Sequence, residues 1–311
     1  MTSVIAELKN EGRYGTAHIY QSTLNAFSAF VGKKEFGFEL LTPRTLKQFE
    51  HYLRNRQRKW NTISTYMRML RATYNRASDQ GIISEAHRIF KGVYTGIERR
   101  RKLALTASEM YRLVYASPRH PLPEAVSQSR DYLRLMLELQ GMPFTDLAHL
   151  HVSDLQEVPC YPQGTKEAIL SCHRQKTNQP LEITVARDTL ELIRQHRPTD
   201  AASPYLLDIL NDSCCGEEEY DAYQQTLRKM NRNLKRLARI QGVGGKISSY
   251  TARHTWATLA KFRGITNELI CDALGHTSVR TTEIYLKAFE SNHLKRANRK
   301  IISYIKGAVT L

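Results

Sequence analysis

The C-terminal part of this chain reads Tyr250-Thr-Ala-Arg253-His-Thr-Trp-Ala-Thr258, then Leu274-Gly-His276-Thr-Ser278, then Thr281-Thr-Glu-Ile-Tyr285-Leu286. These runs bring a cation, an imidazole and a phenol, Arg253, His276 and Tyr285, into one short span. The three groups suit chemistry on a phosphodiester, because a developing phosphorane needs charge stabilisation and a phenol can attack phosphorus. We therefore expect the rest of the chain to hold DNA.

These runs resemble the catalytic motif of the tyrosine recombinases, the phage-integrase family, which reads roughly Arg-His-x-x-Ala, Leu-Gly-His and Thr-x-x-Tyr. His276 follows Arg253 by 23 residues and Tyr285 follows His276 by nine, as in the family. The wording around Tyr250, and the Lys-Ala-Phe that follows Leu286, look most like the branch found in Bacteroidetes mobile elements and DNA invertases. The resemblance implies a mainly α fold with a small β-sheet, in which a helical SAM-like core-binding domain precedes an α+β catalytic domain.

Composition fits a polyanionic partner. The 311 residues suggest two domains, and 46 Lys and Arg against 30 Asp and Glu give a net charge of +16. An ordinary soluble basic protein is the alternative reading of the charge alone. No apolar run reaches the roughly 20 residues of a membrane span, and the N-terminus lacks a signal-peptide pattern, so we expect no membrane contact and a cytoplasmic location. Five cysteines without Cys-x-x-Cys spacing indicate neither a disulfide framework nor a zinc site.

The N-terminal third predicts a helical bundle. Apolar and aromatic residues recur every three to four positions from 16 to 31, which is typical of an amphipathic helix. Thr42 and Pro43 supply the cap and first turn of a second helix. A third helix begins near Asn61 or Thr62 and ends before Gly81. With the resemblance, these helices make residues 1–97 the core-DNA-binding domain.

Positive charge is concentrated between His51 and Lys102, where 13 Lys and Arg face three Asp and Glu. Any one of these side chains could belong to an ordinary solvated face, but their density favours a surface that follows phosphates. The basic run within 98–105 predicts an interdomain linker. The residues predicted to bind DNA are Arg54, Arg56, Arg58, Lys59, Arg68, Arg71, Arg99, Arg100, Arg101 and Lys102.

Residues 106–311 form the predicted catalytic domain and its tail. Thr106 and Glu109 have the spacing of a capping box at a helix start. Two strands, 168–173 and 181–185, flank a polar turn that carries Lys176, and helices follow at 187–196 and 223–240. We expect an acidic loop at 214–221. The tail, 286–311, could dock on a neighbouring subunit or pack on its own domain.

The resemblance assigns the chemistry. Tyr285 would attack the scissile phosphate and form a 3′-phosphotyrosyl linkage with no metal, ATP or other cofactor, although an aromatic core residue is the alternative at helical spacing. Arg253 would bind two non-bridging oxygens through its planar fork. His276 would donate to a non-bridging oxygen or assist proton movement at the tyrosine. Lys176 matches the hairpin lysine that protonates the leaving 5′-oxygen, with ordinary surface exposure as its alternative.

Other positions match the family less closely. Tyr250 stands where the family has His or Lys, and its phenol can donate to a phosphate oxygen but carries protons poorly at neutral pH. His254 and Asp146 are expected to support the site, Asp146 by bracing the arginines. The first family arginine is replaced by Pro143. Arg134 lies nine residues earlier, roughly 13 Å along a helix, so either a residue elsewhere supplies the charge or the site has one arginine fewer.

The sequence thus predicts a site-specific DNA recombinase. Two domains would clamp duplex DNA, and a homotetramer would exchange strands in integration, excision or inversion, with accessory DNA-bending proteins as a further option. Two rivals stay open. A catalytically weakened DNA-binding protein is suggested by Pro143 and Tyr250, and a DNA-relaxing enzyme like the type IB topoisomerases would share the chemistry but act as a monomer.

Overall fold

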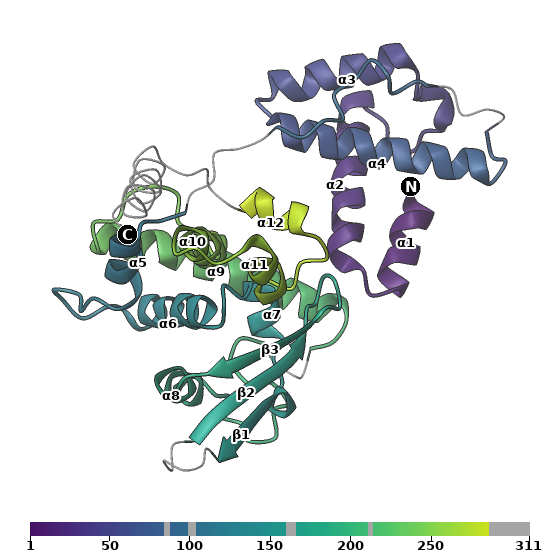
Figure 1. The fold of residues 1–311 in the computed structure, drawn as a ribbon. Coiled ribbons are helices and arrows are strands. Elements are labelled where there is room, and N and C mark those ends of the chain that lie inside the picture. Colours follow the sequence, from purple (N-terminus) through teal and green to yellow (C-terminus); the bar gives the residue numbers. More distant parts are fainter. Residues whose placement is uncertain (84–87, 99–103, 160–165, 211–213, 286–311) are drawn as a thin grey trace, which may run out of the picture. The chain divides into compact units, whose positions relative to one another are not determined.

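The computed structural model describes residues 1–83, 88–98, 104–159, 166–210 and 214–285 (Figure 1). Helices make up most of these residues, and one small antiparallel sheet lies among them. The predicted fold class, mainly α with a small sheet, is confirmed. The chain divides into two compact units, Met1–Arg101 with Gly216–Tyr220 and Lys102–Cys215 with Asp221–Leu311. One boundary lies between Arg101 and Lys102, and the other two enclose Gly216–Tyr220.

Within the described residues of the first unit, every regular element is a helix. The helices predicted from periodicity form, together with a short N-terminal helix, α1, that the sequence analysis missed. Because α1 buries Val4, Ile5 and Leu8 next to Ala17 of the following helix, tertiary packing stabilises it. The elements are α1 Thr2–Asn10, α2 Tyr14–Val31, η1 Phe38–Leu40, α3 Pro43–Asn55 and α4 Trp60–Asp79.

Aromatic and aliphatic side chains from α2, α3 and α4 build the core of this unit. Phe27 and Phe49 meet edge to face with ring centroids 5.1 Å apart, and Ile63 and Met67 are fully buried beside them. The predicted start of α3 is confirmed, because the Thr42 hydroxyl accepts from the backbone N–H of Thr45 at 3.1 Å.

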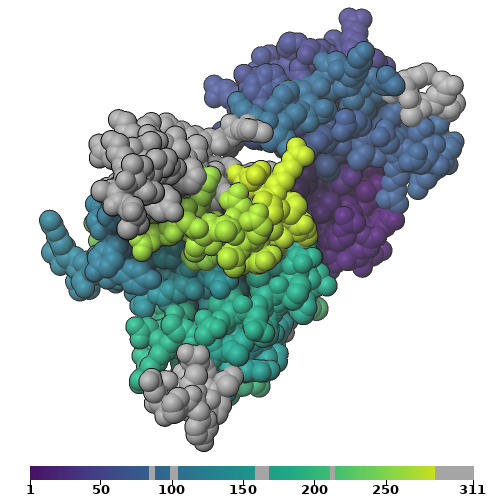
Figure 2. Space-filling model, in the orientation of Figure 1, coloured from purple at the N-terminus to yellow at the C-terminus, as the bar shows by residue number. Residues whose placement is uncertain are grey.

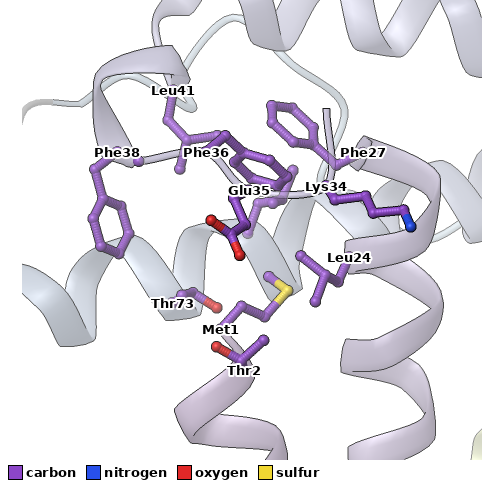
Figure 3. Close-up of a pocket in the computed structure, with 12 residues that line it drawn as sticks. Met1, Thr2, Leu24, Phe27, Lys34, Glu35, Phe36, Phe38, Leu41 and Thr73 are labelled. Carbon is purple, nitrogen blue, oxygen red and sulfur yellow. The ribbon is translucent and has the colours of Figure 1, made fainter. Parts of the chain in front are cut away.

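A pocket of about 220 Å³ lies in the first unit. Its wall is largely apolar, with Leu24, Phe27, Phe36 and Leu41 contributing, and the Met1 side chain reaches toward it from below (Figure 3). The residues predicted to be catalytic belong to the other unit, so this pocket is not their site.

The second unit combines helices with a three-stranded sheet, one face of which packs on the core. The predicted capping box is confirmed, since Thr106 and Glu109 bond reciprocally at the start of the first of these helices. The elements are α5 Ala107–Val114, α6 Glu124–Glu138, α7 Phe144–Ala148, η2 Val152–Asp154, β1 Leu155–Pro159, β2 Lys166–His173, β3 Pro180–Val185, α8 Arg187–Gln195, α9 Glu217–Ile240, α10 Tyr250–Phe262, α11 Asn267–Ala273 and α12 Val279–Tyr285. The first residues of α9, up to Tyr220, are grouped with the first unit.

The sheet has the order β1-β2-β3 with antiparallel pairing throughout. The predicted hairpin is β2 and β3, with Leu170 opposite Ile183, and β1 is an additional strand that the sequence analysis did not predict. Along β2 the side chains of Ala168, Leu170 and Cys172 are buried and Ser171 and His173 are exposed, so one face of the hairpin packs on the core.

The prediction of an acidic loop at 214–221 is wrong for residues 217–221. Helix α9 begins at Glu217, and Glu217, Glu218 and Glu219 form its first turn. Carboxylates are stabilised there by the positive end of the helix dipole, so the acidic run is a helix start.

Among the described residues, no helix combines the length and the apolar character needed to cross a bilayer.

Candidate active site

Arg253 lies in the first turns of α10 and is 2% exposed, an unusual degree of burial for a cation. Its guanidinium donates from Nη1 to the carbonyl oxygen of Gly141 at 3.1 Å and from Nη2 to that of Leu274 at 2.6 Å. Nη2 also lies 2.8 Å from Nε2 of His276. The guanidinium is therefore oriented by backbone carbonyls from two distant segments.

Gly141 explains how its segment comes so close to α10. Its φ is +71°, and a Cβ at this position would lie 3.1 Å from the Arg253 Cα and 3.3 Å from the Trp256 Cβ. Only glycine combines this left-handed backbone with so close an approach. The tight packing brings the Gly141 carbonyl within reach of Arg253.

The imidazole of His276 is held in its neutral form. Burial first, and then the charges of Arg253, Arg174 and Lys176, lower its pKa to about 4. Because a guanidinium can only donate, Nε2 accepts from Arg253, and Nδ1 carries the proton that it donates to the Thr282 hydroxyl at 2.9 Å. The tautomer is thus fixed from both sides.

Thr282 connects this imidazole to α12. The Thr282 side chain is fully buried, and Tyr285 is the last residue of the same helix, less than one turn further on. Figure 2 shows α12 and the segments before it, in yellow-green, at the surface that faces the viewer. The backbone therefore brings the predicted nucleophile near the arginine and the imidazole.

Lys176 lies in the turn between β2 and β3, as predicted, and its side chain is exposed. The turn reaches the segment before His276, because the Thr177 hydroxyl donates to the Gly275 carbonyl at 3.5 Å. The charge of Lys176 also contributes to the lowered pKa of His276. The hairpin turn and the imidazole therefore share one electrostatic environment.

The residue that the sequence analysis missed is Arg174, at the start of this turn. It is 7% exposed, and it forms an ion pair from Nε with Asp146, which is 4% exposed. Its Nη1 donates to the carbonyl of Leu274, and Asp146 also accepts from the backbone N–H of Gln175 at 3.1 Å. Arg174 continues the buried alternation of Ala168, Leu170 and Cys172, and this period of two was the available signal.

Other predicted residues lie at the margin of this cluster. Tyr250 is the first residue of α10 and is 57% exposed, with its ring centroid 6.3 Å from that of His254. Pro143 precedes α7 as its N-cap residue. Arg134 is bound elsewhere, since its Nε donates to Glu138 at 2.8 Å within α6.

The residues predicted to contact DNA in the first unit cluster at the corner between α3 and α4. Arg54 lies 4.4 Å from the Trp60 ring centroid and Arg56 lies 4.6 Å from that of Tyr52, both as cation–π contacts. Arg58 and Lys59 are exposed in the connection, Arg71 is exposed on α4, and Arg68 is half-buried. Arg99, Arg100, Arg101 and Lys102 lie outside the described residues.

Comparisons with known proteins agree with this organisation. Residues 1–91 match the phage integrase SAM-like domain, and residues 104–292 match the phage integrase family. Tyrosine recombinase XerA of Pyrococcus furiosus is 24% identical over 280 residues, which are 89% of this chain and 87% of that protein. Tyrosine recombinase XerC of Thermodesulfovibrio yellowstonii is 25% identical over 280 residues, with 87% and 84% covered.

Solved structures share the fold. The XerH site-specific recombinase in a post-cleavage complex with a palindromic difH substrate has a TM-score of 0.66 at 16% identity, covering 96% of this chain and 84% of that one. A lambda integrase tetramer bound to a Holliday junction has a TM-score of 0.58 at 17% identity, covering 88% and 72%. The resemblance to a Bacteroidetes branch stays a prediction. Because the family match spans more than half of the chain, this protein belongs to the phage integrase family and is a tyrosine-type site-specific DNA recombinase.

Proposed function

We propose that Tyr285 is the nucleophile of this recombinase. Its phenol attacks the scissile phosphate, the 5′-oxygen leaves, and a 3′-phosphotyrosyl linkage holds the cleaved strand. The linkage keeps the energy of the phosphodiester, so the 5′-hydroxyl of another strand can reverse the reaction. The observation that carries the proposal is the Arg253–His276–Thr282 chain of hydrogen bonds, which ends on the helix of Tyr285.

Arg253 and His276 act on the phosphate and the phenol. The Arg253 fork stabilises negative charge on the non-bridging oxygens as the phosphorane develops. His276 has a neutral imidazole, and it can remove the proton of Tyr285 at Nε2 when the bond that Nε2 accepts from Arg253 is released on phosphate binding. Of the two roles expected for this histidine, donation to a phosphate oxygen is the less compatible with that tautomer.

Lys176 is proposed to protonate the leaving 5′-oxygen. An exposed ammonium on a hairpin turn can reach a bound strand, and the charge of Lys176 acts on His276, so both groups serve one reaction centre. Tyr250 is exposed enough to donate to a phosphate oxygen, and His254 supports the α10 side of the site. The pH dependence of cleavage by Lys176→Ala on a substrate with an activated leaving group tests this assignment.

DNA binding is proposed to use both units. The exposed cations at the α3–α4 corner, Arg54, Arg56, Arg58 and Lys59, would contact phosphates of duplex DNA, with Arg68 and Arg71 along α4. Strand exchange would take place in a homotetramer, and a monomer that relaxes supercoiled plasmid without a preferred site would instead favour the topoisomerase-like rival. Sedimentation of the protein on its cognate DNA separates the two.

A suicide substrate nicked beside the scissile phosphate tests the nucleophile, because loss of the short 5′ fragment traps the covalent adduct. Wild-type protein is expected to form an adduct that survives denaturing electrophoresis, and Tyr285→Phe is expected to bind DNA without forming it. Tyr111→Phe is a matched control, since it removes an exposed phenol of the same unit outside the cluster. An adduct with Tyr285→Phe would move the nucleophile to another residue.

A further inference from the structure

We propose that Arg174 is the second phosphate-binding arginine of this site, supplying from the β2–β3 hairpin the charge that the chain lacks at Pro143. The inference rests on the proposed phosphotyrosyl chemistry and adds a catalytic residue to it. Arg174 lies outside the Arg-His-x-x-Ala, Leu-Gly-His and Thr-x-x-Tyr runs, and its place in the site follows from its contacts.

The two guanidinium groups share one anchor. Nη2 of Arg253 and Nη1 of Arg174 both donate to the carbonyl oxygen of Leu274. Two nitrogen atoms bonded to one oxygen can be no more than about 6 Å apart, twice the length of a hydrogen bond. That separation suits two donors on different non-bridging oxygens of one phosphate, and Leu274 immediately precedes the Gly275-His276 pair of the site.

Several features hold Arg174 in this position. Its stem follows the buried face of β2, and Gly275, at φ +59°, leaves room for it, since a Cβ there would lie 2.8 Å from the Arg174 Cγ. The backbone of Arg174 closes the turn through its bonds with Gln179 and Asn178. Asp146 pairs with Nε and fixes the plane of the guanidinium, so Asp146 is a positioning residue.

Asp146 also relates Arg174 to the lost arginine. It lies in α7, three residues after Pro143, in the segment where the family has its first arginine. Hence the segment that no longer provides a guanidinium still provides the carboxylate that orients one. The other nearby candidate, Arg134, pairs with Glu138 in α6.

Burial argues for a function beyond stability. A buried ion pair loses much of its attraction to desolvation, and apolar side chains of similar volume often serve stability better. Here Arg174 and Asp146 are each more than nine-tenths buried. Burial first, and then the charges of the cations around His276, lower its pKa, and the scissile phosphate is an anion that these clustered cations would attract.

The test compares cleavage of two suicide substrates, one with an ordinary scissile phosphate and one with a methylphosphonate, in which a neutral methyl group replaces a non-bridging oxygen. On phosphate, Arg174→Ala should form adduct about 10²–10³-fold more slowly than wild type, the range for losing one transition-state donor. On methylphosphonate less charge develops, so the ratio of wild-type to variant rates should shrink at least tenfold. Arg134→Ala, which breaks another ion pair of this unit, should match wild type on both substrates.

Arg174→Lys keeps a positive charge and most of the stem, so it tests the role even if Arg174→Ala does not fold. On the phosphate substrate, its rate of adduct formation should lie between those of wild type and Arg174→Ala. On the methylphosphonate substrate, its defect should likewise be smaller. The proposed role of Arg174 would be overturned if a variant had a defect of equal size on both substrates, or if Arg174→Ala cleaved at the wild-type rate. Either result would leave the phosphotyrosyl mechanism intact. Absence of any adduct with wild-type protein would overturn the phosphotyrosyl mechanism as well, and this separates the two failures.

Discussion

Gly275→Ala should disable the site although it replaces no functional side chain. The glycine has a φ of +59°, and an added Cβ would lie 2.8 Å from the Cγ and 3.2 Å from the Cδ of Arg174. Arg174 cannot simply swing away, because Asp146 holds its Nε and the hairpin turn holds its backbone. The methyl group must therefore push the guanidinium off the Leu274 carbonyl or force the 274–276 segment outward.

The magnitude follows from two contributions. An L-residue in the left-handed region costs about 1–2 kcal/mol, and a lost hydrogen bond to a charged group costs about 1.5–3 kcal/mol. Gly242→Ala isolates the first contribution, because Gly242 has a φ of +61° and no atom within 4 Å of an added Cβ. We expect Gly275→Ala to lose about 2.5–5 kcal/mol of unfolding free energy, the sum of the two ranges, and Gly242→Ala to lose only the backbone contribution.

Urea unfolding followed by circular dichroism gives the free energies, and the suicide substrate gives the cleavage rates of the folded variants. Gly275→Ala should cleave at least about 10²-fold more slowly than Gly242→Ala, as expected when one transition-state donor is displaced. The methylphosphonate substrate should relieve the defect if Arg174 has moved, and should not if strain has shifted His276. Equal unfolding free energies and equal cleavage rates for the two alanine variants would refute the reasoning.

Three further predictions concern the neighbours. Asp146→Asn should lower the unfolding free energy by about 3–5 kcal/mol, because it leaves Arg174 buried without its carboxylate, and urea unfolding measures this loss. The pKa of His276 is lowered to about 4 in the folded protein, so as the pH falls the unfolded chain takes up a proton at this residue first. The unfolding free energy of the wild type should therefore decrease between pH 6.5 and pH 4, and that of His276→Gln should decrease less steeply. Urea unfolding measured across this pH range checks the difference. Arg58→Ala should weaken DNA binding at all sequences and reduce the salt slope by about one, as measured by fluorescence anisotropy.

The sequence predicted those parts of the fold whose signals are local. Capping residues and apolar periodicity located α3, α5 and the β2–β3 hairpin, because each depends on residues a few positions apart. Helix α1 escaped prediction since its stability comes from packing on α2. The acidic start of α9 resembles a loop in sequence, because a run of like charges is unfavourable in a helix unless the helix dipole stabilises it.

For the candidate site, motif spacing predicted Arg253 and His276, which lie in contact in the structure, but it could not point to Arg174. The family motif specifies residues by their positions along the chain, whereas a phosphate is bound by any cation that lies close to it in the folded protein. Arg174 reaches Leu274 from a segment 100 residues away. The sequence signal for Arg174 is a cation at a buried position of a strand. This signal indicates a site only when the groups that pair with the cation are known.

The hairpin turn has one more consequence, through Arg174 and Lys176, which are separated by Gln175 alone. One of these cations is assigned to the phosphate and the other to the leaving oxygen. Under these two proposals, a displacement of the turn would remove both charges from the site at once, so phosphate binding and leaving-group protonation in the cleavage step would be lost together.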